Sequence, residues 1–347
     1  TGNQEFPAYA SLALQQSNFT GGTSVITNSN PNLKWETTTT QGVGVDFSMF
    51  NGRLNGTVDY FNKSTQDLLF LISYPQPAAS ADRWVNLPGN VVNKGWEFGL
   101  DYQLVRPAYR GAFGWDVSYN MSFLKNNVEG FGSTVVNTGE VSGQGLSGAY
   151  AQTIRDGYPL FTFVMPTFLR FDAFGNGVYA NGAKDELQGS ALPKFNAGLT
   201  NNFSYKKFTA SFFFNAVTGF VVYNNTANAL LLKGSLKNAK NVTRDVVNSI
   251  ENSINPGNVS TRFLEKGDYI RFANASISYA VDVKQGSFIK GLNISLSGQN
   301  LGLFTKYSGL DPEVNVDKSR NGVPSRGFDY TATPRARVFT LGINARF

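Results

Sequence analysis

The chain contains no cysteine and no histidine in its 347 residues. Their absence excludes thiol chemistry, a Ser-His-Asp triad and the common zinc and iron ligand sets. Charged residues make up 16% of the sequence, below the roughly 25% of a typical soluble domain. The Lys and Arg residues give a net charge of +6 but are scattered, so no basic cluster with interleaved aromatics predicts nucleic-acid binding.

Long apolar runs are missing as well. No stretch approaches the roughly 18 consecutive apolar residues of a transmembrane helix, and the mean hydropathy is -0.21. Aromatic residues, by contrast, reach 14%, with 29 Phe and 15 Tyr. Few charges, many aromatics and no helical span are together typical of a membrane β-barrel, whose lipid-facing residues alternate with polar lumen residues.

Alternation of apolar and polar residues is the main pattern that is present. In its clearest stretch, every second residue from Phe113 to Phe123 is apolar, while the residues between them include Asp116 and Asn120. A period of two predicts a β-strand with two different faces. A soluble β-sandwich would bury the apolar face in a core, whereas a transmembrane barrel would turn it to lipid.

The alternation predicts about eleven strands and two kinds of connection. The strands lie at 33–50, 53–61, 95–105, 113–124, 148–155, 161–170, 195–205, 208–217, 263–281, 289–304 and 338–347. The short connections lie at 51–52, 106–112, 156–160, 206–207 and 282–288, and the long ones at 62–94, 125–147, 171–194, 218–262 and 305–337. Outer-membrane barrels alternate short periplasmic turns with long extracellular loops in this way.

This alternation gives each strand a direction. With Phe347 at the periplasmic end, Thr1 lies on the extracellular side, where an exported chain does not begin. Two open sheet edges would also leave backbone groups unpaired in lipid. We therefore expect the C-terminal half of a larger barrel, with residues 1–32 as an extracellular loop segment that enters the barrel.

Several local patterns support an all-β antiparallel barrel. The closing strand places Phe339, Leu341, Ile343 and Phe347 on one face, which fits a barrel-assembly signal at the C-terminus. Asn51-Gly52 is a hairpin turn sequence, because both residues accept a positive φ. A helix-like stretch at 227–254 is expected within the longest loop.

Ordered sequence blocks resemble those of the SusC/RagA-like family. The blocks are Leu33-Lys-Trp-Glu-Thr-Thr-Thr39, Asn93-Lys-Gly-Trp-Glu97, Gly157-Tyr-Pro159, Pro193-Lys-Phe-Asn-Ala-Gly-Leu199, Glu265-Lys-Gly-Asp-Tyr-Ile-Arg271 and Thr305-Lys-Tyr-Ser-Gly-Leu-Asp-Pro-Glu-Val-Asn315. They occur in the family's order and cover nearly the whole chain. Members are TonB-dependent transporters of the Bacteroidetes outer membrane.

The resemblance implies a 22-stranded barrel with an N-terminal plug, of which this chain gives about the last eleven strands. It implies active import of oligosaccharides or peptides, with a SusD-like surface lipoprotein as a lid and energy from the TonB-ExbB-ExbD complex. The plug and TonB box lie outside this chain. Many relatives carry an acidic calcium-type stretch where this chain has Asp172-Ala-Phe-Gly-Asn-Gly177, with too few carboxylates for a metal site. We expect no metal and no cofactor.

The candidate contact residues are aromatics of the predicted outer loops. They either stack on sugar rings, clamp a peptide or contact the lid, or they pack the loops themselves. The candidates are Trp84, Tyr150, Phe220, Tyr223, Tyr307 and Tyr330. Three further tryptophans, Trp35, Trp96 and Trp115, are expected in the girdles at the membrane boundaries.

Catalysis is not expected. Asp311 and Glu313 could pass for paired carboxylates, but two acids in such a loop more often fix its conformation. The leading hypothesis is thus an importer and not an enzyme. Two alternatives remain open: a passive porin-like channel and a secreted β-sandwich adhesin.

Overall fold

The computed structural model describes residues 13–16, 23–27, 30, 32–73, 82–284, 286, 288–320 and 322–347. The predicted loop segment 1–32 lies mostly outside the described residues, as does part of the loop at 62–94. Within segment 1–32, β1 (Ala13–Gln16) and β2 (Thr23–Thr27) pair in antiparallel fashion. The helices of the described residues are short, and none has the length and apolar character that crossing a membrane requires.

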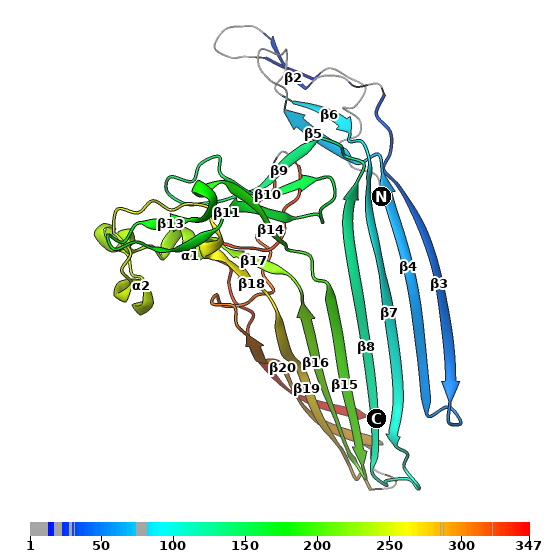
Figure 1. The fold of residues 1–347 in the computed structure, drawn as a ribbon. Coiled ribbons are helices and arrows are strands. Elements are labelled where there is room, and N and C mark those ends of the chain that lie inside the picture. The colour runs from blue at the N-terminus through cyan, green and yellow to red at the C-terminus, as the bar shows by residue number, and fades with distance from the viewer. Residues whose placement is uncertain are drawn as a thin grey trace.

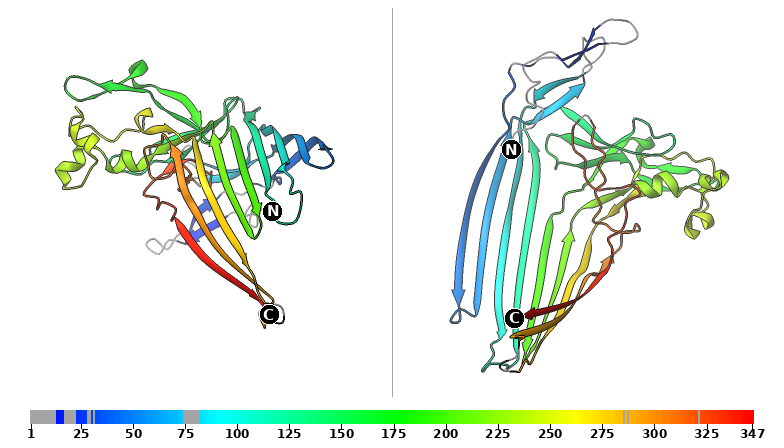
Figure 2. Two further views of the ribbon diagram at one scale, coloured as in Figure 1. Left: turned by 90° about the horizontal axis from the view of Figure 1, so that it is seen from below. Right: turned by 180° about the vertical axis from the view of Figure 1, so that it is seen from behind.

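One antiparallel sheet of nine strands forms a tall, curved wall (Figures 1 and 2). Its order is β22-β20-β19-β16-β15-β8-β7-β4-β3, so each wall strand pairs with the wall strand that precedes or follows it along the chain. The strands are β3 (Thr37–Met49), β4 (Leu54–Gln66), β7 (Asn90–Val105), β8 (Gly114–Glu129), β15 (Phe195–Tyr205), β16 (Phe208–Thr218), β19 (Tyr269–Val281), β20 (Gly291–Thr305) and β22 (Val338–Arg346). The shortest, β22, has 9 residues, enough for a tilted membrane crossing.

The prediction of eleven wall strands is wrong by two. The segments predicted at 148–155 and 161–170 do form strands, but these strands lie outside the wall. They are β10 (Tyr150–Arg155), β11 (Thr162–Pro166) and β12 (Phe168–Phe171). The four central residues of β10 are all buried, so both of its faces are covered by protein. The short connection at 156–160 is therefore not a periplasmic turn.

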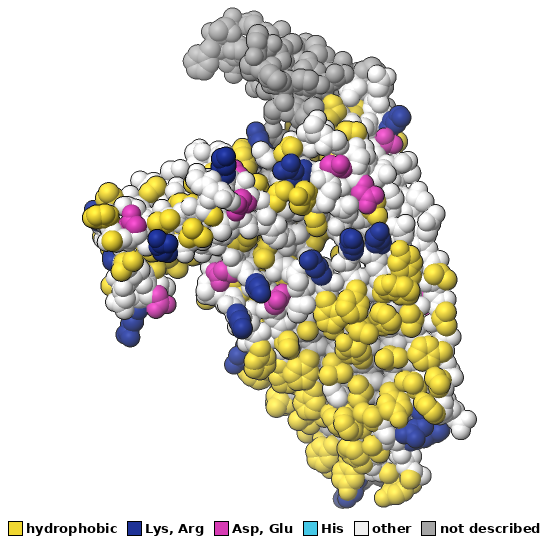
Figure 3. Space-filling view, viewed as in Figure 1, with side chains coloured by type: hydrophobic (Ala, Val, Ile, Leu, Met, Phe, Trp, Pro, Cys, Tyr) yellow, Lys and Arg dark blue, Asp and Glu magenta, His cyan; other side chains and the backbone are white. Residues whose placement is uncertain are grey.

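The outer face of the wall is apolar and aromatic. Rings on neighbouring strands contact one another: Trp115 lies 5.5 Å from Phe203, and Phe214 lies 4.5 Å from Phe272, centroid to centroid. Figure 3 shows a broad apolar field over the lower part of the wall, with charged side chains above the field and at its lower end. Phe339 and Leu341 on β22 remain 67% and 69% exposed.

This exposed field settles the choice that alternation left open. A β-sandwich covers the apolar face of one sheet with a second sheet. Here the buried clusters of the described residues lie in the connections and at the rim of the wall, and no layer formed by those residues covers the field. The adhesin alternative is therefore wrong, because its core would need the aromatics that this wall leaves exposed.

Tight turns join the lower ends of the wall strands. The predicted Asn51-Gly52 turn is confirmed, with φ values of 56° and 76° and a hydrogen bond from the Arg53 amide to the Phe50 carbonyl. Between β15 and β16 only two lysines intervene, and Lys207 pairs with Asp282 of the next turn. These turns keep all short connections of the wall at one end.

The long connections gather at the other end. We call residues 130–194, 219–268 and 306–337 the outer lobe. The predicted loops at 125–147 and 171–194 are parts of one continuous connection between β8 and β15, because the strands between them left the wall. Its main sheet is β14-β11-β10-β9, with β9 (Val135–Glu140) and β14 (Asp185–Ser190) at the edges.

Smaller elements complete the upper end. They are β5 (Leu69–Ser73), β6 (Asp82–Asn86), β13 (Gly177–Tyr179), β17 (Val221–Asn224), β18 (Leu264–Lys266), β21 (Phe328–Asp329), α1 (Asn225–Leu230), α2 (Arg244–Asn248) and the 3-10 turns η2 (Ala180–Ala183), η3 (Lys233–Asn238) and η4 (Thr261–Phe263). The helix-like stretch predicted at 227–254 is thus several short pieces. Ala239 ends η3 with a left-handed φ of 53°, a conformation that does not continue a helix.

Phe163, Tyr223 and Phe328 form the centre of the lobe core. They come from three separate connections, so the core ties β11, β17 and β21 together. The lobe is therefore a packed body above the wall and not a set of independent loops (Figure 1).

Candidate functional site

The inner face of the wall carries a polar groove of about 600 Å³ below the outer lobe. Asp59, Glu97 and Asn120 line it from β4, β7 and β8, and Asn196 and Asn215 from β15 and β16. These residues alternate with the outward apolar residues, which is why one sequence pattern produces both the apolar field and the groove. We call this surface the wall groove.

Glycines hollow out the wall groove. A Cβ at Gly198 would lie 2.8 Å from the Asn120 Oδ1, and one at Gly99 would lie 2.9 Å from the Thr57 Oγ1. A larger residue at either position would displace those side chains into the groove. The missing side chains therefore leave open the space that the neighbouring amide and hydroxyl groups face.

A buried arginine fastens the last long connection to the inner wall. Arg271, on β19, donates from Nη2 to the Asp311 Oδ1 at 2.6 Å and from Nη1 to the Asn300 Oδ1 at 2.6 Å. Asp311 Oδ1 also accepts a hydrogen bond from the Glu313 amide, and Arg335 pairs with Glu313 at 2.8 Å. The prediction that Asp311 and Glu313 fix the loop is confirmed. Glu313 in addition reaches the wall groove.

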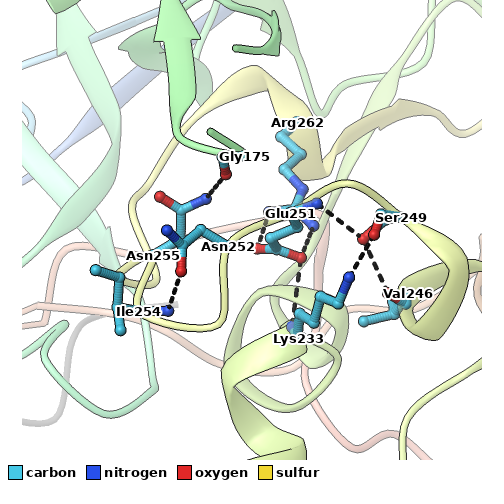
Figure 4. Close-up of polar contacts among 9 residues, drawn as sticks. All are labelled: Gly175, Lys233, Val246, Ser249, Glu251, Asn252, Ile254, Asn255 and Arg262. Carbon is cyan, nitrogen blue, oxygen red and sulfur yellow. Dashed lines mark hydrogen bonds and ion pairs between the residues drawn. The ribbon is translucent and has the colours of Figure 1, made fainter. Parts of the chain in front are cut away.

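A second buried ion pair fixes the outer part of the lobe (Figure 4). Arg262 donates two hydrogen bonds to Glu251, at 2.7 and 2.9 Å, and its guanidinium lies 4.9 Å from the Phe171 ring centre. Glu251 is 2% exposed. Next to it, Asn252 and Asn255 each donate a hydrogen bond to the Gly175 carbonyl. The turn at 172–176 is thereby held against the loop at 249–255.

Asp172 shapes that turn from within. Its Oδ1 accepts hydrogen bonds from the amides of Phe174 and Asn176 at 2.9 and 2.8 Å. Hydrogen bonding, chiefly from the Asn176 amide, lowers the pKa of Asp172 below its usual value. The carboxylate thus has backbone partners, in keeping with a turn.

Three of the six predicted contact aromatics are buried inside the chain. Phe220, Tyr223 and Tyr307 are 9%, 0% and 5% exposed. The Tyr307 hydroxyl donates to the Asp329 Oδ2 at 2.7 Å, and burial raises the pKa of Tyr307 and of Tyr223. Their contact role is corrected to a packing role, because core side chains hold their rings away from the surface.

The other three all lie beside the segment at 318–322. Trp84 is in β6, where its carbonyl accepts from the Asn30 side chain. Tyr150 begins β10 and has the Arg320 guanidinium 4.3 Å from its ring centre. Tyr330 follows β21, and the Lys318 Nζ lies 4.0 Å from the centre of its ring. These half-buried rings stay predictions as contact residues.

Tyr330 lines a second hollow, of about 510 Å³, within the outer lobe. Its wall comes from the loop after β9, from α1 and η3, and from the loop at 253–257. We call it the lobe hollow. Its side chains are mainly carboxamides and hydroxyls.

The wall tryptophans and the closing strand lie as their alternation suggested. Trp96 is 47% exposed on the outer face. Trp115 donates from Nε1 to the Asn201 Oδ1 at 3.2 Å and so satisfies an outward amide. Trp35, 56% exposed, precedes β3. Ile343 and Phe347 are outward and exposed, and the Phe347 ring lies 5.0 Å from Phe288. Their girdle and assembly roles stay predictions.

Sequence reasoning missed Arg271, Glu251 and Arg262. Arg271 did carry a signal: it stands between Ile270 and Phe272 in an alternating strand, so it had to face inward. The sequence gives no such signal for Glu251 and Arg262, because no periodicity links two residues in an irregular loop.

The chain resembles known proteins in its sequence. The profile of the family described as TonB dependent receptor-like, beta-barrel, matches residues 3–301. TonB-dependent receptor P3 of Formosa agariphila is 28% identical over 100% of this chain and 38% of the receptor. TonB-dependent receptor SusC of Bacteroides thetaiotaomicron is 28% identical over 92% of this chain and 32% of its own length.

A solved structure shares the fold. The RagAB peptide transporter superposes with a TM-score of 0.77 and 20% identity, over 97% of this chain and 38% of that chain. The chain thus spans well under half the length of the proteins it matches. These matches confirm the resemblance that the sequence blocks carry, and the antiparallel barrel fold with it.

Proposed function

Because the chain belongs to the family of TonB-dependent receptor-like β-barrels, we propose that it forms the C-terminal part of an active importer. As a member of this receptor family, the chain lies in the bacterial outer membrane and is not an enzyme. The observation that carries the proposal is the contrast between the two faces of the wall. An exposed aromatic face suits lipid, and the polar wall groove on the other face suits the passage of hydrated cargo.

The proposed cargo is an oligosaccharide or a peptide. The charged side chains that line the wall groove, among the described residues, are the carboxylates Asp59, Glu97 and Glu313. They favour neutral or cationic cargo over anionic cargo. Asn120, Asn196 and Asn215 offer amide donors and acceptors that hydroxyl groups or peptide bonds can match.

The proposed partners are a SusD-like surface lipoprotein and the TonB-ExbB-ExbD complex. The related RagAB peptide importer has open-open and closed-closed states, which supports a lid that opens and closes over the outer lobe. TonB would act on a plug that precedes the wall. No bond is made or broken in this cycle: the lobe and lid capture the cargo, and plug movement opens the lumen.

Uptake by living cells tests the proposal. Deletion of the full-length gene should abolish growth on one class of oligosaccharide or peptide, and the same loss should follow from deletion of tonB or from a protonophore. Growth that survives loss of TonB would contradict active import. Ion conductance by the full-length protein in a planar bilayer, without removal of any domain, would support the passive channel instead.

A further inference from the structure

Lysines follow the upper edge of the apolar field. On β7 and β8 the last outward rings toward the outer lobe are those of Trp96 and Phe123, which pair across the two strands and are exposed. Lys94 and Lys125 stand two residues further toward the lobe on these strands, so they lie on the same face. Both lysines are exposed. Figure 3 shows several Lys and Arg side chains along this upper edge.

Lys94 and Lys125 are directly opposite each other in the sheet. Like charges in such a cross-strand pair repel, because their Cβ atoms lie only about 5 Å apart. The ion pairs of the described residues include neither lysine. The next outward carboxylate along β8 is that of Glu129, which accepts a hydrogen bond from the Asn127 side chain. An anion between the two lysines would replace their repulsion by attraction.

A hollow of about 380 Å³ opens beside Lys125, where the wall meets the outer lobe. Its lining comes from the upper part of β8, from the turn after β10 and from the segment at 190–194. We call it the boundary notch. Lys125 and Lys194 are its charged lining residues, and no carboxylate is among the lining residues that the structure describes. Its charge therefore suits an anion.

Backbone hydrogen bonds fix the frame of the boundary notch. The Leu124 amide donates to the Lys194 carbonyl at 2.9 Å. The Val128 amide donates to the Tyr158 carbonyl, also at 2.9 Å. The two bonds join the outer lobe to β8 on either side of residues 125–127. The notch is thus formed before any ligand arrives, which lowers the entropy cost of binding.

We propose that the boundary notch binds the phosphate group of an anionic lipid in the outer leaflet of the membrane. Lys125 and Lys194 contact the phosphate oxygens, and Lys94 adds a third positive charge beside them. The acyl chains of the same lipid lie along the apolar field below. This inference goes beyond the import function, because it concerns the lipid around the barrel and not the cargo inside it.

The position of the notch favours a lipid over a soluble anion. The rings of Phe123 and Phe195 lie 4.8 Å apart, centroid to centroid, on the strands that carry the notch lysines at their upper ends. A lipid satisfies the charged notch and this aromatic surface with one molecule, whereas a free phosphate uses the lysines alone. Basic pockets at the end of a membrane-spanning region bind lipid headgroups in this way.

The first test uses full-length protein, purified in a non-ionic detergent, with two forms of one lipid. Native mass spectrometry measures the binding of bisphosphorylated lipid A and of the same lipid after enzymatic removal of its phosphates. The original protein should bind the phosphorylated form about tenfold more tightly or better, since each lysine contributes about 1 kcal/mol near a charged lipid. Equal binding of the two forms would overturn the proposal, and this comparison needs no variant.

A double variant, Lys125→Gln with Lys194→Gln, locates the site. It should bind the phosphorylated lipid about tenfold more weakly or worse than the original protein. The matched control, Lys184→Gln with Lys237→Gln, removes the same charge from exposed positions of the outer lobe and should bind like the original. Heat-modifiable migration on gels checks that each variant is folded. Equal affinities of the two double variants would overturn the assignment to the notch.

Inorganic phosphate separates a lipid site from a site for any small anion. Added at the same concentration as the lipid, it should leave the lipid bound, because the acyl chains contribute apolar contact that phosphate lacks. Displacement of the lipid under these conditions would show a free-anion site and overturn the lipid assignment.

Discussion

At the scale of single residues, the two ion pairs most open to experiment differ in burial. Glu251 and Arg262 have side-chain exposures of 1% and 19%, whereas Lys207 and Asp282 have 40% and 81%. Taking one partner from a buried pair leaves a charge without water or counter-ion, while an exposed pair contributes little. Removal of one charged partner should therefore destabilise the fold far more at the Glu251–Arg262 pair than at the Lys207–Asp282 pair.

We predict that Arg262→Met destabilises the outer lobe by about 3–5 kcal/mol, because it strands the buried Glu251 carboxylate. Hydrogen exchange of the amides at 233–262 measures this effect as a loss of protection. Lys207→Met, the control at the exposed pair, should leave hydrogen exchange near its turn almost unchanged, because water solvates Asp282 when its partner is lost. Equal effects of the two substitutions would mean that Glu251 is hydrated in solution.

Asp172 gives a pH response at the same scale. Because its folded pKa is lower than its unfolded pKa of about 4, its carboxylate stabilises the turn at higher pH, and that contribution is lost as the pH falls through the folded pKa. We predict that at pH 5 pepsin cleaves after Phe174 more slowly in the original protein than in Asp172→Asn. By pH 2 the two rates should converge.

Cleavage after Phe288, which is 80% exposed and belongs to a turn at the other end of the wall, corrects for pepsin's own pH dependence. Its rate should be the same in both proteins at every pH. A ratio at Phe174 that stays constant from pH 5 to pH 2 would show that the Asp172 charge does not hold the turn.

At the scale of elements, the two faces of each wall strand should respond in opposite ways to charge. Leu341 faces outward on β22, where it pairs with Leu296, and Thr340 faces inward. We predict that Leu341→Arg costs about 2–4 kcal/mol of barrel stability if the site lies near the bilayer centre, and that Thr340→Arg costs much less. Urea unfolding of the full-length barrel in lipid vesicles compares the two.

The end of β22 tests the assembly signal. Phe347 is outward and contacts Phe288, whereas Asn344 is one of the inward residues of the same strand. We predict that Phe347→Ser lowers the amount of folded barrel in the outer membrane several-fold, and that Asn344→Ser does not. Heat-modifiable migration on gels reports the folded fraction. Equal amounts for both variants would assign Phe347 to packing alone.

The sequence predicted the wall well because each wall strand carries one apolar and one polar face. The period of two therefore survives in β7, β8 and β15, and it fixes which residues face inward. It misplaced 148–155 because β10 is buried on both faces, and a short connection after it imitates a periplasmic turn. Length was the overlooked signal: β10 and β11 have 6 and 5 residues, too few to cross a membrane.

The lobe was less predictable for a physical reason. Its core joins Phe163, Tyr223 and Phe328, and no local rule states that three connections far apart in sequence pack together. The sequence around an aromatic residue in a long loop is the same whether its ring binds a ligand or packs in the core of the lobe. The lobe hollow is invisible in the sequence for the same reason, since Asn228 and Gly257 meet only after folding.

At the scale of the whole molecule, the open edges of the wall decide whether it can exist alone. Among the described residues, β3 pairs only with β4, and β22 only with β20. Each edge strand leaves a row of amide and carbonyl groups that lipid cannot satisfy, at several kcal/mol per group. The apolar field adds a surface that water cannot cover without aggregation.

We therefore predict that residues 1–347, expressed alone behind an export signal, accumulate as aggregate, because lipid cannot satisfy the two edges and water cannot cover the apolar field. Expressed with the remaining strands of the full-length gene, the same residues should give a heat-modifiable barrel in the outer membrane. The contrast isolates edge pairing, since sequence and compartment are otherwise identical. A monomeric chain that stays dissolved without detergent would instead mean that the aromatic face finds a cover within these residues, and the membrane assignment of the wall would fall with it.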